Sequence, residues 1–386
     1  MNTQRTQLSN FASIHRMRAL ARAGTALALA VLASALVWLV WPETGPYVQF
    51  PLPLQQLFGD GAAAAQVVAL VQALIGAAAA SAGFGILTGR PAAAQPLAIV
   101  SLVCGALLAI GFVGFSGIAV AGYLMAAALP ILALVVGLMV AKRPQTRVLV
   151  VVAFAALIVI ALLSPIPFAE FYERLGANFA TDHFRTSATV LFIGAAGVWL
   201  LSGMGVVARE PGRLGAFALR RRRALTIAAA ACALPYVIAR ATWLTPWPLF
   251  GGDQIEKVGP EVLATGLLLG GAMLVGAVLT LGLIMTWGSR FPKWVPRIGS
   301  KPVPVALAVV PASIVAALFT AGGIETLITL FAGIGVAPVS QWILVIALPF
   351  WLWGPLLGLA TWGYAQARAL EPDAPVNSRG GVVAAA

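Results

Sequence analysis

Long runs of apolar residues, separated by short polar segments, dominate the chain. A helix needs about 20 apolar residues to cross about 30 Å of hydrocarbon. Ten runs of suitable length occur, at residues 23–40, 62–87, 96–115, 118–140, 148–163, 188–207, 224–239, 262–287, 303–323 and 341–364. The fifth and seventh runs are short, and flanking residues such as 242–244 extend them into the interface. The pattern predicts an all-α, polytopic transmembrane helix bundle of about ten spans.

The order of the runs also indicates how the chain is organised. The predicted segments are a basic cytoplasmic N-terminal segment (1–22), transmembrane spans 1–4 (23–140), a connector with spans 5–6 and an outer amphipathic helix (141–223), transmembrane spans 7–10 (224–364) and a disordered cytoplasmic tail (365–386). Each set of four spans begins after Arg-Ala-Leu, ends its first span near Trp and Pro, and continues through Phe-Gly-Asp or Phe-Gly-Gly-Asp. This likeness predicts a parallel repeat of spans 1–4 and 7–10.

Basic and acidic residues are distributed unequally over the segments between the runs. With the N-terminus inside, the inside segments hold 20 of the 24 Lys and Arg residues, and the outside segments hold 9 of the 12 Asp and Glu residues. Cytoplasmic loops carry the excess of basic residues in membrane proteins. The distribution predicts a multi-pass protein of the cell (plasma) membrane with both termini cytoplasmic. Its basic segments, densest at residues 220–223, are expected to contact anionic headgroups of the lipid bilayer, with a docking or inositide site at 220–223 as the alternative.

Composition excludes other classes of protein. The chain is 61% hydrophobic and 9% charged, whereas water-soluble domains carry about 25% charged residues. Intrinsic disorder of the whole chain is excluded as well, because disorder needs low hydrophobicity and high charge. The net charge of +12 is spread over several inside segments, so we expect no nucleic acid as a partner.

Candidate chemistry is sparse. Two histidines and two cysteines are present, without a CxxC, HExxH, GxSxG or Walker motif, and we predict no catalytic residue, no metal site and no cofactor. No Asp, Glu, Lys, Arg or His lies inside any of the ten runs, which argues against a proton-coupled carrier. Gln72 is expected to form an interhelical hydrogen bond. Two GxxxG pairs, Gly266 with Gly270 and Gly354 with Gly358, are expected to pack helices.

Arg240 is a basic residue on the predicted outside and directly follows the seventh run. Tyr236 precedes it by four residues and Trp243 follows it by three, so the guanidinium is expected between two aromatic rings. Glu325, expected just beyond the outer end of the ninth run, is the acid predicted to neutralise it. Residues 327–336 are expected to be interfacial or re-entrant. Arg240 is then either an anchor at the interface or a ligand for an anionic group.

An inside loop at residues 289–302 is rich in proline, tryptophan and basic residues. We predict an ordered anchor in which Arg290 and Trp294 lie at the headgroups. Its sequence, from Trp287 to Pro296, resembles the W-G-x-R-F-P-x-W-x-P stretch of a group of uncharacterised multi-pass membrane proteins of actinobacteria. The resemblance is best over spans 7–10; it implies the same architecture and assigns no reaction.

Three functions are consistent with the sequence. The first is an accessory or scaffold-like membrane protein without an assigned biochemical activity. The second is a small-solute permease with proline-kinked helices, and the third is a lipid-modifying enzyme at the outer face. A permease needs a polar cavity within the membrane, an enzyme needs two or three acids around one outer pocket, and a scaffold needs neither.

Overall fold

Helices make up nearly all of the described structure. The computed structural model describes residues 2–49, 61–88, 94–118, 143–163, 183–207, 212–250, 260–291, 299–332 and 339–370, together with several single positions between these ranges. Within these residues there is no β-strand, and the β-pairing is an isolated bridge between Arg290 and Pro302. The predicted all-α class is confirmed for this part of the chain.

The described helices include seven that are long and apolar enough to cross a membrane. They are Arg18–Val40, Ala62–Leu87, Ile99–Ile118, Thr186–Gly203, Arg222–Leu244, Val305–Phe331 and Trp342–Leu370. Two shorter apolar helices, Pro144–Ile160 and Leu269–Leu281, coincide with the fifth and eighth predicted spans. The fourth predicted span, the outer amphipathic helix and residues 371–386 lie almost entirely outside the described residues. The chain is therefore a multi-pass membrane protein, and the total of ten spans and the parallel repeat stay predictions.

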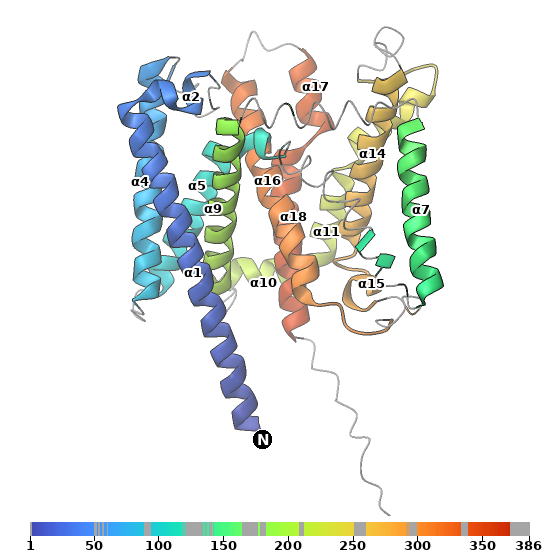
Figure 1. Cartoon of the computed structure of the whole chain (residues 1–386), viewed down its shortest axis with the longest axis horizontal. Helices are drawn as coiled ribbons and strands as arrows, with labels where there is room; N and C mark the ends of the chain where they lie inside the picture. The colour runs from blue at the N-terminus through green and yellow to red at the C-terminus, as the bar shows by residue number, and fades with distance from the viewer. Residues whose placement is uncertain are drawn as a thin grey trace, which may run out of the picture.

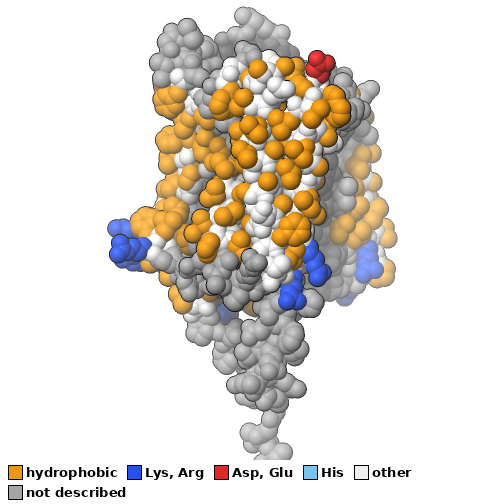
Figure 2. Space-filling view, turned by 90° about the vertical axis from the view of Figure 1, so that its left-hand side faces the viewer, with side chains coloured by type: hydrophobic (Ala, Val, Ile, Leu, Met, Phe, Trp, Pro, Cys, Tyr) orange, Lys and Arg blue, Asp and Glu red, His pale blue; other side chains and the backbone are white. Residues whose placement is uncertain are grey.

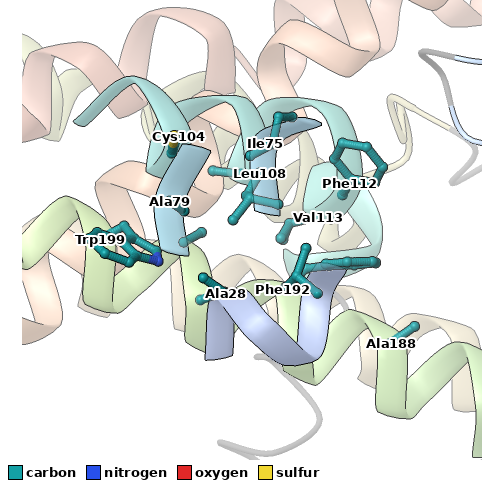
Figure 3. Close-up of a cluster of buried hydrophobic side chains, with 14 of the residues drawn as sticks. Ala28, Ile75, Ala79, Cys104, Leu108, Phe112, Val113, Ala188, Phe192 and Trp199 are labelled. Atoms are coloured by element: carbon teal, nitrogen blue, oxygen red, sulfur yellow. The ribbon is translucent and has the colours of Figure 1, made fainter. Parts of the chain in front are cut away.

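One group of helices forms the left part of the bundle in Figure 1. It consists of α1 (Asn2–Val40), α4 (Ala62–Leu87), α5 (Ala94–Leu108) and α9 (His183–Val207). Their buried side chains form one hydrophobic cluster (Figure 3). Trp199 of α9 is completely buried in it. Its ring lies 3.3 Å from the Cβ position of Gly24 on α1 and 3.1 Å from that of Gly83 on α4. Small residues thus let three helices meet around one large ring.

A second hydrophobic cluster lies among the later helices. They are α11 (Arg222–Ala231), α12 (Leu234–Ala241), α14 (Pro260–Leu281), α16 (Val305–Ala332) and α18 (Phe350–Leu370). The helices α16 and α18 touch backbone to backbone, because the Cβ position of Gly323 falls on the backbone of Trp351 and that of Gly354 falls on the backbone of Thr320. The predicted packing role of Gly354 is confirmed.

Short helices interrupt or connect the spans. They are η1 (Pro42–Thr44), α2 (Pro46–Gln49), the π-helix η3 (Ala109–Val113), α10 (Gly212–Arg220), η4 (Thr242–Leu244), α15 (Thr286–Ser289) and α17 (Val339–Ala347). The longer apolar helix α7 (Pro144–Leu163) corresponds to the fifth predicted span. Pro349 lies between α17 and α18, and its missing N–H cannot continue a helix. By contrast, Pro311 and Pro355 lie inside α16 and α18. The predicted extension of the seventh run through residues 242–244 is confirmed by η4.

The ninth span is longer than the sequence predicts. α16 continues as one helix to Ala332, so Glu325 lies inside this helix and residues 327–332 are not a separate segment. The candidate span Val305–Phe331 therefore contains an acidic residue, two positions beyond the end of the predicted run. The glycines before Glu325 suggest a helix end, but Gly322 and Gly323 are the points where Phe115 and Trp351 approach α16. α18 likewise runs to Leu370, through residues 365–370 that were assigned to the tail.

Charged side chains lie at the two ends of the bundle. Figure 2 shows a broad apolar band with Lys and Arg along its lower edge and an acidic side chain at its upper end. The first residues of α1 lie at the lower end (Figure 1). The basic end is thus the end from which the first helix enters the bundle.

Gln72 connects three elements on the left side of the bundle. The Gln72 side chain is completely buried in α4. Its Nε2 donates to the carbonyl of Val31 and to the hydroxyl of Ser34 on α1, both at 2.9 Å. The hydroxyl of Tyr47 on α2 donates to its Oε1, and burial raises the pKa of Tyr47, which keeps this proton on the phenol. The predicted interhelical hydrogen bond is confirmed.

Candidate functional site

A break in the third span presents a backbone donor to another helix. The π-helix η3 ends at Gly114, which has a φ of 51°, a conformation that glycine adopts without steric cost. The backbone N–H of the next residue, Phe115, donates to Oε2 of Glu325. A Cβ at Gly114 would overlap this carboxylate oxygen. The sequence Gly114-Phe115 thus allows the broken helix to hold Glu325.

Glu325 lies well inside α16. It is 20 residues from Val305 and seven from Ala332, which corresponds to about 30 Å and about 10 Å along the helix axis. Its side chain is half-buried. Glu325 belongs to the candidate span Val305–Phe331, and an ionised group in hydrocarbon is costly and usually has a function. The hydrogen bond from Phe115 offsets part of this cost, because charge-assisted bonds are stronger than neutral ones.

The Glu325 carboxylate lines a cavity of about 210 Å³. We call this cavity the Glu325 pocket; it is lined by Phe115, Glu325, Thr326, Thr329, Leu330, Leu344 and Val345. Four of these residues come from α16 and two from α17. The hydroxyl of Thr326 donates its proton to the carbonyl of Gly322. Glu325 and the two threonines thus form a polar patch in a mostly apolar wall.

Aromatic rings connect the pocket with the contact between α16 and α18. The ring of Phe115 lies 6.3 Å from that of Phe350. Phe350 stacks on Phe319 at 4.4 Å, and Phe319 meets Trp353 edge-on at 4.8 Å. The pocket wall at Phe115 is therefore continuous with the tightly packed second cluster.

Arg240 takes the position predicted between two rings. Its Cζ atom lies 4.8 Å from the centre of the Tyr236 ring and 4.0 Å from that of Trp243. Gly270 of α14 lies against its stem, with a Cβ position 2.9 Å from the Cβ of Arg240. Its Nε–H is buried, with no hydrogen-bond partner in the described part of the chain. The cation–π arrangement is confirmed, and so is the packing role of Gly270.

The predicted neutralisation of Arg240 by Glu325 is not found. Both side chains are described, and Glu325 bonds to Phe115 while Arg240 is held between the rings of Tyr236 and Trp243. Trp243 is fixed in turn, because its Nε1–H donates to the carbonyl of Leu249 at 2.6 Å. The prediction fails because α16 extends past Glu325 and directs it toward the break after η3.

Removing the Arg240 side chain should destabilise the C-terminal end of α12. We expect Arg240→Ala to cost about 1–2 kcal/mol, because the cation–π contacts and the packing against Gly270 are lost. Arg240→Lys should cost less, since it keeps the charge but not the planar group. Thermal unfolding of the purified protein measures both, with exposed Arg223→Ala as control. An unchanged Tm for Arg240→Ala would show that Arg240 is incidental.

The loop with the predicted anchor residues is closed at its base. The N–H of Phe291 donates to the carbonyl of Lys301 at 3.0 Å, and the N–H of Val303 donates to that of Ser289 at 2.9 Å. The Arg290 side chain is exposed beside this base, and Trp294 lies outside the described residues. The predicted contacts of Arg290 and Trp294 with lipid headgroups therefore stay predictions.

Arg368 holds the same loop from the end of α18, and the sequence-based prediction missed it. Its guanidinium donates to the carbonyls of Ser289 at 3.0 Å and Val303 at 3.2 Å. Four residues earlier, the hydroxyl of Tyr364 donates to the carbonyl of Gly288 at 2.8 Å. The Tyr-x-x-x-Arg spacing is the same as in Tyr236 to Arg240 and was the available signal.

Loss of the Arg368 contacts should expose the loop to proteases. In the unmodified protein we expect trypsin to cut near Arg213 or in the tail well before Lys293, because the base of the loop is hydrogen-bonded. Arg368→Ala should make cleavage at Lys293 at least about tenfold faster, since it removes two hydrogen bonds from a charged donor. Mass spectrometry of timed digests measures the order of cleavage, with Arg223→Ala as control. Early cleavage at Lys293 in the unmodified protein would contradict an ordered anchor.

The helices α16 and α18 thus connect three features: the Glu325 pocket, the rings of Phe319, Phe350 and Trp353, and the hydrogen-bonded base of the loop at residues 289–302. The chain matches no family model, no curated protein and no solved structure. The resemblance of residues 287–296 to the actinobacterial stretch stays a prediction, and the geometry of the Glu325 pocket is the basis for a functional interpretation.

Proposed function

We propose that this multi-pass membrane protein is a small-solute permease that binds its solute in the Glu325 pocket. The observation that carries the proposal is a carboxylate inside a span, beside a cavity and bonded to the backbone of a broken helix. Carriers commonly place their solute sites at discontinuous helices, whose backbone groups supply charge and hydrogen bonds. Two interrupted helices border this pocket, one at Gly114 and one at Pro349.

The other two functions account less well for Glu325. A charged group in the hydrocarbon costs about 2.5–3.5 kcal/mol or more, and a scaffold has no need for it. A lipid-modifying enzyme needs two or three acids around one pocket, and Glu325 is the acidic residue that lines this one. A permease uses the carboxylate to bind its solute.

Uptake into liposomes tests the permease proposal. The purified full chain is reconstituted, and the uptake of radiolabelled methylammonium, ethanolamine, glycine betaine, lactate and glycerol is compared with that of empty liposomes. We expect at least one probe to enter faster with the protein, and Glu325→Gln to reduce this rate about tenfold or more. Glu43→Gln, the same change at an exposed position, should have no effect. Folded protein that admits none of the five probes would contradict the proposal.

The same proposal assigns an orientation. The basic end of the bundle faces the cytoplasm by the positive-inside rule, so both termini lie inside and the pocket lies toward the outside of the plasma membrane. Topology reporters should then report outside at positions 60, 182 and 253 and inside at positions 143, 215 and 293. One reversed position would contradict this orientation.

A further inference from the structure

The Arg240 guanidinium is packed so that one of its edges stays open. The stem of Arg240 lies against Gly270 of α14, and its Nε–H is buried. The rings of Tyr236 and Trp243 lie 4.8 Å and 4.0 Å from its Cζ atom. The side chain as a whole is nevertheless partly exposed. The exposed part is therefore the outer edge, which carries the two Nη groups.

This open edge is an unused set of hydrogen-bond donors. Over the described residues, Arg240 makes its cation–π contacts but has neither an ion pair nor a hydrogen bond. A guanidinium presents its N–H groups in a planar fork that matches the oxygens of a phosphate or a carboxylate. Such charge-assisted, bidentate contacts are among the strong hydrogen bonds of proteins. The geometry thus suits an anionic group that is not part of the described chain.

Two glycines of α14 make the arrangement rigid. A Cβ at Gly266 would lie 2.3 Å from the ring of Trp243, and one at Gly270 would lie 2.9 Å from the Cβ of Arg240. The indole of Trp243 is also fixed by its hydrogen bond to the carbonyl of Leu249 at 2.6 Å. The guanidinium is therefore oriented before a ligand binds, which reduces the entropy cost of binding.

The surroundings of this edge favour a lipid over a soluble anion. Arg240 lies four residues before Leu244, the last residue of the candidate span Arg222–Leu244. The side chains of Leu244 and Trp247 are 71% and 79% exposed. Exposed apolar surface gains nothing from a soluble anion but is covered by an acyl chain. We infer that Arg240 binds the phosphate of an anionic phospholipid, whose acyl chain covers Leu244.

Photocrosslinking beside Arg240 tests this inference. Leu244 of the full chain is replaced by p-benzoylphenylalanine, and the detergent-purified protein is irradiated with radiolabelled dioleoylphosphatidylglycerol. We expect Arg240→Gln to reduce the captured label about tenfold or more, because the charged fork is lost. Arg240→Lys should reduce it about threefold, since it keeps the charge without the planar fork. Arg240→Lys also keeps the test valid if Arg240→Gln does not fold.

The other end of the same candidate span provides a matched control. Ile227 is exposed and follows the exposed Arg223 by four residues, as Leu244 follows Arg240. With p-benzoylphenylalanine at position 227, Arg240→Gln should leave capture unchanged. With the probe at position 244, Arg223→Gln should leave capture unchanged. Equal capture at position 244 with and without the Arg240 guanidinium would overturn the inference.

Competition distinguishes the sources of the phosphate. Unlabelled dioleoylphosphatidylglycerol should suppress capture at position 244, and dioleoylphosphatidylcholine should need about tenfold more, because its choline offsets the negative charge. Inorganic phosphate that competes as well as dioleoylphosphatidylglycerol would overturn the lipid assignment, and so would equal competition by the two lipids. Arg240 does not line the Glu325 pocket, so this inference does not depend on the permease proposal.

Discussion

Gly323→Leu is expected to abolish folding of the second helix group. The Cβ position of Gly323 falls on the backbone of Phe350 and Trp351, and a backbone cannot move aside as a flexible side chain can. Overpacking a core typically costs about 1–3 kcal/mol, and separation of two helix backbones should exceed that range. We therefore expect little folded protein in size-exclusion profiles after detergent extraction.

Gly271→Leu is the matched control for this change. Gly271 lies in the middle of α14, and no atom lies within 4 Å of its Cβ position. The larger side chain should then extend from the bundle, and the protein should elute as the unmodified chain does. Equal yields of folded Gly323→Leu and Gly271→Leu would show that α16 and α18 do not touch backbone to backbone.

Gln72→Leu should cause the next largest loss of stability. Leucine is similar in size to glutamine, but the change removes three interhelical hydrogen bonds and leaves the hydroxyl of Tyr47 without its acceptor. Such bonds contribute on average about 0.6 kcal/mol each in a membrane bundle, and up to about 1.7. We expect a loss of about 2 kcal/mol, measured as a lower Tm or by unfolding in denaturing detergent.

Gln66→Leu is the control for Gln72→Leu on the same helix. The Gln66 side chain is exposed, and its single bond to the carbonyl of Leu39 is long, at 3.3 Å. This change should leave stability nearly unchanged. A double-mutant cycle with Tyr47→Phe isolates the bond from Tyr47, because coupled neighbours are not additive. Equal losses for Gln66→Leu and Gln72→Leu would contradict the buried network.

The fold class and some contacts could be predicted because they depend on nearby residues. Apolar runs of sufficient length specify membrane helices, since only a helix satisfies its own backbone in hydrocarbon. The position of Arg240 between Tyr236 and Trp243 follows from spacings of four and three residues on one helical face. Gln72 was predicted as an interhelical donor because a buried amide needs a partner, although its partners on α1 and α2 were not predicted.

The pocket could not be predicted because its parts are far apart in the sequence. The donor Phe115 and the acceptor Glu325 are separated by 210 residues. The π-helix that frees this donor has no distinct sequence signal beyond the glycines around it. Hydropathy placed the end of the ninth span at Gly323, because Glu325 interrupts the apolar run. The donor from Phe115 on another segment, which helps to hold this carboxylate, cannot be read from the run itself.

The central claim is that the Glu325 carboxylate faces a water-accessible pocket in the helix bundle, and the reactivity of a cysteine within the pocket tests it. Thr329→Cys is made with the buried native thiols removed by Cys104→Ala and Cys232→Ala. The new cysteine is modified with two methanethiosulfonate reagents, a cationic aminoethyl one and an anionic sulfonatoethyl one. Each reaction rate is divided by the rate of the same reagent with a free thiol in solution. We expect the cationic reagent to react about tenfold faster or more, which is about 1.4 kcal/mol, and Glu325→Gln to abolish this preference. Equal normalised rates with Glu325 in place, or no reaction with either reagent, would contradict the claim.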